Sequence, residues 1–209
     1  MSEPLNIHHV SNPHGNTQIP DPHQGTYSKT VLGFWMYLMT DCILFATLFT
    51  TYAVLHHNTF GGPSSRDLFS LPTTLAETIL LLFSSVTCGL GMVASLKNKS
   101  SQVVGWFAIA FLLGASFVAI ELTEFHGIVS EGHSWKTSAF LSSFFTLVGT
   151  HGLHVSIGLL WMLVVMIQVF VHGITIHTFR RLVVFSLFWH FLDLVWIFIF
   201  TFVYLMGVI

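Results

Sequence analysis

Five long apolar segments, separated by short polar stretches, organise the sequence. The segments lie near residues 31–55, 73–96, 103–128, 139–171 and 183–207. Each has at least the roughly 20 residues that a helix needs to cross the hydrocarbon core of a bilayer. The stretches between them carry residues that stop helices, such as Gly61, Gly62 and Pro63 in the first one. The pattern predicts an all-α membrane protein, a bundle of five transmembrane helices.

A transmembrane β-barrel is the other way to span a bilayer, and its strands alternate apolar and polar residues. The run Thr-Ile-Leu-Leu-Leu-Phe at residues 78–83 does not alternate. The pattern therefore favours helices over barrel strands.

Composition identifies lipid as the solvent of most of the surface. Hydrophobic residues make up 53% of the 209 residues and charged residues only 8%, against roughly 25% charged in an average soluble domain. The formal net charge of −2 gives no basic excess that would indicate nucleic-acid binding. The two cysteines, Cys42 and Cys88, fall inside apolar segments, where they are expected to pack rather than to form a disulfide framework.

The first 28 residues differ from the rest of the chain. They are polar and contain Pro4, Pro13, Pro20 and Pro22 but no apolar core of a signal peptide. We expect residues 1–28 to form a flexible N-terminal tail and residues 29–209 to form one transmembrane domain.

The distribution of Lys and Arg predicts the orientation. With five spans, the N-terminus shares one side of the membrane with the second and fourth connections. That side holds five of the seven basic residues, namely Lys29, Lys97, Lys99, Arg180 and Arg181. Because positive residues concentrate on the cytoplasmic side, the N-terminus is predicted to be cytoplasmic and the C-terminus periplasmic.

Ionisable side chains inside the apolar segments are the most informative feature for function. No Lys or Arg lies within these segments, but several acids and histidines do: Asp41, Glu77, Glu121, Glu124, His126, His151, His154, His190 and Asp193. At 1.5 Å per residue, Asp41, the pair His151 and His154, and the pair His190 and Asp193 reach about mid-depth. The three glutamates are expected nearer the outer leaflet. Such residues are costly in hydrocarbon unless they are paired, neutralised or turned toward protein.

Three interpretations of the mid-depth residues compete. Chains of carboxylates and imidazoles occur in proton pathways, and His151-x-x-His154 places two imidazoles on one helical face, as a metal or haem site would require. The third interpretation is interhelical hydrogen bonding, worth about 0.6 kcal/mol per bond. Two ligands do not complete a zinc or haem site. We therefore expect no catalytic, cofactor-binding or metal-binding residue in this chain, and we favour packing while a proton role stays open.

Small and aromatic residues mark expected helix contacts. Ser85 and Gly89 lie four apart, and small residues recur in the fourth segment at Gly149, Gly152 and Ser156. Such faces allow close approach of helices, within the bundle or with a partner subunit. Trp189 and Trp196 lie seven apart on one face and are expected in a protein contact.

Two motifs resemble a known family. The stretches Gly-Thr-His-Gly-Leu-His at 149–154 and Trp-His-Phe-Leu-Asp-Leu-Val-Trp at 189–196 are similar to signatures of subunit III of haem–copper terminal oxidases. Asp41, within Met-Thr-Asp-Cys-Ile-Leu-Phe at 39–45, matches a buried acid of that family, and Glu124-Phe-His126 resembles its acidic aromatic stretch. The resemblance runs from about Gly33 to the C-terminus.

The five spans, the tail and the aspartate at position 41 resemble the quinol-oxidising branch of the family, the bacterial cytochrome bo type. The resemblance implies a non-catalytic subunit without cofactors, packed mainly on subunit I beside subunits II and IV in the bacterial inner membrane. The complex would oxidise ubiquinol, reduce O2 to water and pump protons, with haem and copper in subunit I and phospholipid bound to the bundle. The alternatives are subunit III of a cytochrome c oxidase and a small independent proton or ion transporter.

Overall fold

The structure is a computed structural model, and it describes residues 24–55, 71–97, 99–130 and 138–205. In this part of the chain, five helical spans are long and apolar enough to cross a membrane, which confirms the predicted all-α, five-span architecture. The elements are α1 (Gln24–Leu55), α3 (Leu71–Leu96), α4 (Ser100–Ser130), α5 (Ala139–His172), α6 (Ile176–Ile199) and the π-helix η1 (Phe200–Leu205), which continues α6.

Two helices, α1 and α6, begin well before the apolar segments that predicted them. α1 begins at Gln24, inside the predicted tail, and residues 1–23 of that tail lie outside the described residues. α6 begins at Ile176, whereas the sequence placed residues 172–182 in a connection. Gly173 reverses the chain after α5 with a φ of 68°, a conformation that glycine adopts without steric cost. Thr175 then caps α6 by accepting a hydrogen bond from the Thr178 amide at 3.2 Å.

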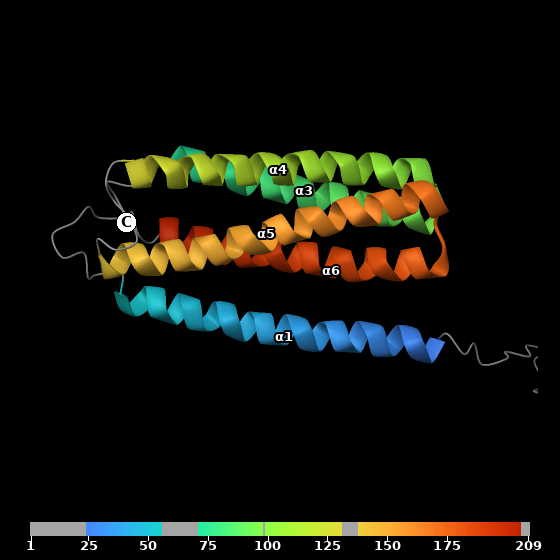
Figure 1. Cartoon of the computed structure of the whole chain (residues 1–209), viewed down its shortest axis with the longest axis horizontal. Helices are drawn as coiled ribbons and strands as arrows, with labels where there is room; N and C mark the ends of the chain where they lie inside the picture. The colour runs from blue at the N-terminus through green and yellow to red at the C-terminus, as the bar shows by residue number, and fades with distance from the viewer. Residues whose placement is uncertain (1–23, 56–70, 98, 131–137, 206–209) are drawn as a thin grey trace, which may run out of the picture.

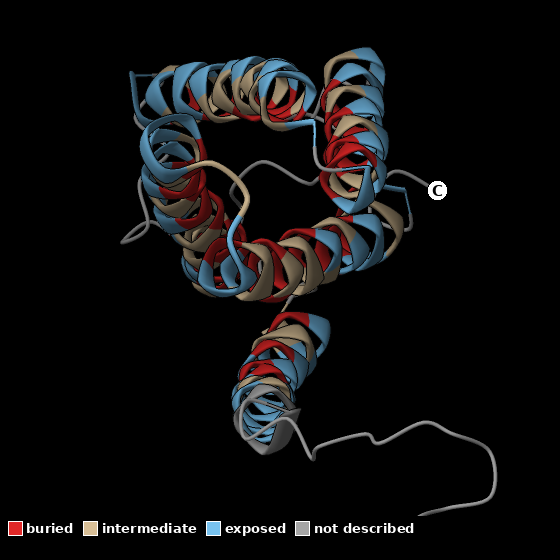
Figure 2. Cartoon of the chain, turned by 90° about the vertical axis from the view of Figure 1, so that its right-hand side faces the viewer, coloured by how far each residue is buried: buried red, intermediate tan, exposed pale blue. Residues whose placement is uncertain are grey.

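Four helices form a ring, and α1 stands outside it. Each of the pairs α3–α4, α4–α5, α5–α6 and α3–α6 is in contact, and α1 packs on α5 and α6 alone among the strongly contacting pairs. Figure 1 shows the helices running side by side along the long axis, and Figure 2 shows the ring from its end with α1 set apart. One face of the ring, between α5 and α6, is therefore covered by α1, while no further described helix covers the α3–α6 and α4–α5 faces.

The interior of the ring is built from aromatic and aliphatic side chains. Trp196, Phe117 and Phe107 are almost completely buried, whereas Leu112 and Leu160 on the outside are 66% and 67% exposed. Apolar residues thus face both the core and the outside, as expected when the surrounding solvent is hydrocarbon.

Close helix contacts occur at glycines other than those predicted. A Cβ atom on Gly114 or Gly158 would lie 3.0 Å from the Trp189 ring, and a Cβ on Gly91 would lie 2.6 Å from Phe107. At Gly89 and Gly152, by contrast, a Cβ would meet no atom within 4 Å. Among the described residues, no neighbouring helix approaches these two positions, so their predicted role in helix contacts, within the bundle or with a partner subunit, stays a prediction.

The other predicted packing residues are placed in different ways. Gly149 lies near Phe125, with 3.8 Å from its notional Cβ to the ring. The Ser156 hydroxyl donates to the Gly152 carbonyl of its own helix at 2.8 Å. Trp189 and Trp196 are both buried between helices.

Candidate functional site

The polar residues of the spans gather into three separate groups. We call Asp41 and His154 the covered pair, Ser85, His190 and Asp193 the open site, and Glu77, Glu121 and Glu124 the acidic cluster. The first two groups lie near the middle of their spans and the third lies nearer one end.

The covered pair joins α1 to α5. His154 Nε2 lies 3.3 Å from Asp41 Oδ1, so Asp41 has the histidine partner on a neighbouring helix that we expected. His154 Nδ1 is 2.7 Å from the Thr150 carbonyl. Because a carbonyl only accepts, Nδ1 carries a proton and donates it to Thr150. Nε2 faces the Asp41 carboxyl group, and a proton on either of these two groups would form a hydrogen bond between α1 and α5.

His151 lies close to the covered pair but does not join it. Its side chain is only 1% exposed, and neither ring nitrogen has a hydrogen-bond partner within the described residues. The ring stacks on Trp196, with 5.3 Å between ring centroids, and the edges of Phe117 and Phe45 approach it at 6.1 Å and 6.4 Å. His151 is thus held by aromatic packing.

The two imidazoles of the His-x-x-His motif do not converge on a common point. His154 engages Asp41 and Thr150, while His151 is enclosed by rings. No group of three His, Cys, Asp or Glu side chains among the described residues has metal-binding geometry. Within the described residues, His151 and His154 therefore do not form a shared ligand pair for a haem or copper ion.

Hydroxyl groups on α3 bind the tryptophans of α6 inside the ring. Trp189 Nε1 donates to the Ser84 hydroxyl at 3.2 Å, and that hydroxyl donates to the Ala110 carbonyl of α4 at 2.9 Å. Trp196 Nε1 donates to the Thr78 hydroxyl at 3.1 Å, two helical turns further along. The sequence analysis identified both tryptophans but missed Ser84 and Thr78, whose spacing of six residues nearly matches that of the tryptophans on the antiparallel helix.

The open site lies immediately outside these hydrogen bonds between α3 and the tryptophans of α6. The Ser85 hydroxyl is 2.6 Å from His190 Nδ1, and Asp193 interacts with both Ser85 and His190. Ser85 is 8% exposed, whereas His190 is exposed and Asp193 is half-buried. The predicted neighbours His190 and Asp193 are thus brought together, but on the outer surface of the ring and with a serine that was expected only to pack.

The acidic cluster is formed by α3 and α4 near the end of the bundle where η1 lies. The antiparallel register that sets Gly91 against Phe107 places Glu77 opposite Glu121, since both steps are fourteen residues. Glu77 and Glu121 are 0% and 4% exposed, and none of their four carboxyl oxygens has a hydrogen-bond partner in the described part of the chain. Both acids interact electrostatically with Glu124, and all three with Tyr204.

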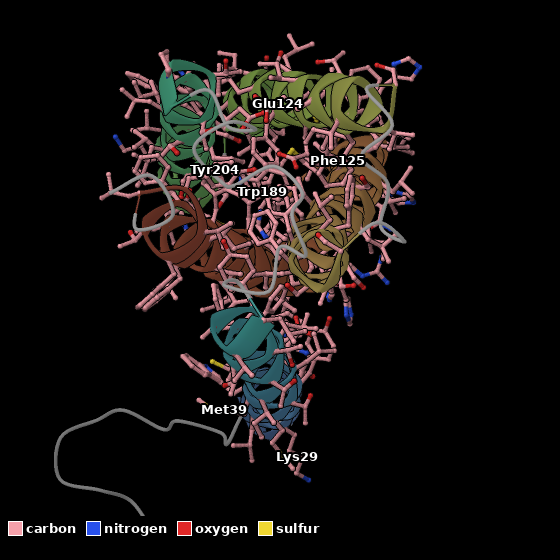
Figure 3. The ribbon with its side chains drawn as sticks, turned by 90° about the vertical axis from the view of Figure 1, so that its left-hand side faces the viewer. Lys29, Met39, Glu124, Phe125, Trp189 and Tyr204 are labelled. Carbon is pink, nitrogen blue, oxygen red and sulfur yellow. The ribbon has the colours of Figure 1, made fainter. Side chains whose placement is uncertain are left out.

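Tyr204 was not identified from the sequence as part of this cluster. It lies on η1, whose π-helical geometry changes the direction of side chains after α6. Figure 3 views this end of the bundle and shows Tyr204 and Trp189 in the space between the four helices, with Glu124 on α4. Tyr204 was missed because the π-turn has no clear signal in the apolar sequence.

Comparisons with known proteins identify relatives over almost the whole chain. The family model described as cytochrome c oxidase subunit III matches residues 18–208. The chain is 53% identical to cytochrome bo(3) ubiquinol oxidase subunit 3 of Pseudomonas aeruginosa over 99% of both chains. It is 46% identical to quinol oxidase subunit 3 of Bacillus spizizenii, over 93% of this chain and 96% of that one. It is 49% identical to cytochrome c oxidase subunit 3 of Bacillus sp. strain PS3, over 85% and 86%.

Proposed function

The chain belongs to the cytochrome c oxidase subunit III family, and from this premise we propose its role as subunit III of a membrane-bound quinol oxidase. The observation that carries the proposal is the 53% identity to a ubiquinol oxidase subunit 3 over 99% of both chains. Relatives named as quinol oxidase subunits also align over more than nine-tenths of their own length. The chain is thus a component of a haem–copper ubiquinol oxidase and of aerobic electron transport.

Within this complex we assign the chain a structural role. Haem and copper would reside in subunit I, which the chain would stabilise, with subunits II and IV as further neighbours. The geometry supports this division because the imidazoles of His151 and His154 are engaged separately, one with aromatic rings and one with Asp41. Ubiquinol oxidation, O2 reduction to water and proton pumping would then belong to the complex, and no step of them is placed on a residue of this chain.

The location and orientation follow from the same proposal. The described basic residues Lys29, Lys97, Lys99, Arg180 and Arg181 lie at the end of the bundle that holds the α3–α4 and α5–α6 connections. We place this end at the cytoplasmic face of a bacterial inner membrane, so the acidic cluster lies toward the periplasm. Phospholipid would cover the apolar outer surface.

A role as an independent proton transporter has less support. Phe45, Phe117, Trp196 and His151 pack together between the covered pair and the acidic cluster. This aromatic layer separates the two polar groups along the bundle, within the described residues.

The test is purification through an affinity tag on this chain from membranes of its own organism. The expected result is a multi-subunit complex with the absorption spectrum of haem and an activity that consumes O2 with ubiquinol. Activity with reduced cytochrome c in place of ubiquinol would contradict the quinol assignment. Recovery of the chain without any haem-containing subunit would contradict its role as an oxidase subunit, and proton flux through the chain alone in vesicles would restore the transporter alternative.

A further inference from the structure

The open site occupies an unusual position for ionisable residues. His190 lies in the middle of the span Ile176–Leu205, and Ser85 lies in the middle of Pro72–Leu96. Ionisable side chains at this depth almost always face the bundle interior, a water-filled cavity or a partner, because hydrocarbon solvates them poorly. Yet His190 is exposed on the outer surface of the α3–α6 face.

No other described part of the outer surface resembles this one. The large exposed residues at mid-depth of α4 and α5 are apolar, for example Leu112, Ile157 and Leu160, and the exposed Ser116 hydroxyl donates to the Leu112 carbonyl of its own helix at 2.8 Å. The other exposed acidic, basic and histidine residues of the described spans, such as His126, His172 and Arg181, lie close to helix ends, where headgroups and water are within reach. Lipid chains suit the α4–α5 face, but they leave His190 without a hydrogen-bonding partner at its outer nitrogen.

The shape of the surface beside His190 permits close approach by a helix. Gly89 lies one turn beyond Ser85 on α3, and a Cβ placed on it would meet no atom within 4 Å. The described residues therefore leave the surface at Gly89 uncovered, four residues from Ser85 and next to a hydrogen-bonding side chain. Small residues and polar residues together are the two features that hold transmembrane helices against each other.

The hydrogen bonds within the open site indicate the chemistry of the partner. If the Asp193 carboxylate accepts from the Ser85 hydroxyl, then that hydroxyl accepts from His190 Nδ1–H at 2.6 Å. His190 Nε2 is then an acceptor that points away from Ser85. No hydrogen bond to Nε2 is found among the described residues, and lipid chains offer no donor, so a complementary donor would come from another molecule.

We infer that the α3–α6 face, centred on Ser85, Gly89, His190 and Asp193, docks against a transmembrane helix of another oxidase subunit that presents a hydrogen-bond donor at mid-depth. This inference rests on the proposed function, because membership of a multi-subunit oxidase supplies the partner. The donor is a hydroxyl, amide or cationic side chain, and the neighbouring small residues bring the two helices into contact.

The first experiment maps the face by photocross-linking in the intact oxidase. A photoreactive phenylalanine analogue replaces Leu82 or Leu194, which flank the open site and are 41% and 51% exposed. Leu112 and Leu160, on α4 and α5, serve as control positions. Adducts to another oxidase subunit from positions 82 and 194, with lipid adducts from 112 and 160, are the expected result. Subunit adducts only from the control positions, or only lipid or quinone adducts from 82 and 194, would overturn the docking face.

The second experiment measures how much of the chain stays in the complex during detergent purification. Gly89→Leu is expected to increase release about threefold or more, comparable to the loss of one interhelical hydrogen bond. Gly152→Leu is the matched control, because its Cβ position is equally open but lies on α5, outside the α3–α6 face. Equal retention of both variants, or greater release of Gly152→Leu, contradicts the proposal.

The same retention measurement also tests the polar side chain of the open site. His190→Leu is expected to weaken retention, and His190→Gln to restore part of it, since glutamine keeps an acceptor. His126→Leu, which removes another exposed histidine, should leave retention unchanged. Absence of the wild-type chain from the purified oxidase would overturn the proposed function itself, whereas a wild-type chain that is retained but unaffected at Gly89 and His190 would overturn only the docking face.

Discussion

The covered pair and the open site lie at the same depth and each contains a carboxylate and an imidazole, yet their surroundings differ. α1 covers Asp41 and His154 against α5, so that Asp41 is 6% exposed. The open site lies on the α3–α6 face, which no other described helix covers, and His190 is exposed. A buried polar pair fixes how helices of one chain pack, whereas an uncovered one at the same depth indicates a contact between chains.

The largest effect on stability is expected when one member of the covered pair loses its partner. Asp41→Leu is expected to destabilise the chain by about 3 kcal/mol, because His154, whose side chain is only 16% exposed, is left without its partner. Unfolding of the purified chain in mixed micelles with increasing SDS measures this change. The double variant Asp41→Leu with His154→Leu should recover most of the loss, and a double variant as unstable as the single one would show that the pair is not the cause.

In the assembled oxidase the same site is expected to affect durability more than chemistry. Asp41→Asn keeps a polar group beside His154 but removes the carboxyl group. The initial rate of ubiquinol oxidation should stay close to that of the wild type, while activity during prolonged turnover or storage declines faster. An immediate and complete loss of oxidation in an intact complex would assign Asp41 a direct part in the reaction.

Overpacking tests the tight interior that lies just behind the open site. Gly158→Ala places a Cβ 3.0 Å from Trp189 and 3.2 Å from Phe188, and the chain should lose about 1–3 kcal/mol of stability. Gly152→Ala on the same helix meets nothing within 4 Å and is the control. Similar stability of the two variants in SDS titrations would contradict the packing described around Trp189.

Neighbouring serines distinguish the inside of the ring from the outside. Ser84→Ala removes an acceptor for Trp189 and a donor to Ala110, so about 1 kcal/mol of stability should be lost at ~0.6 kcal/mol per bond. Ser85→Ala should cost less in the isolated chain, because its partner His190 lies on the surface. A larger effect of Ser85→Ala than of Ser84→Ala on the isolated chain would reverse the comparison.

The smallest effect is expected at the exposed histidine. His190→Gln should change the stability of the isolated chain by no more than about 0.5 kcal/mol, as for other surface substitutions. The SDS midpoint of the isolated variant provides the measurement. A loss as large as that of Asp41→Leu would mean that His190 supports the fold of the chain itself.

Much of the architecture could be predicted from local sequence. Runs of about 20 or more apolar residues define five spans, and the rise of 1.5 Å per residue fixes the depth of each polar side chain within a few residues. For this reason Asp41, His154 and His190 were correctly expected near the middle. The motifs at 149–154 and 189–196 were sufficient to indicate the family that the comparisons then showed.

Helix rotation and order around the ring could not be predicted in the same way. The five helices carry apolar residues on all sides, because lipid and protein interior are equally apolar solvents, so the sequence does not mark which face points inward. Only the tertiary structure separates His151 from His154, places His190 on the outside, and assigns close contacts to Gly114 and Gly158 instead of Gly89 and Gly152. Depth in the membrane is a property of the sequence along one helix, whereas the partner of a side chain depends on which other helix lies beside it.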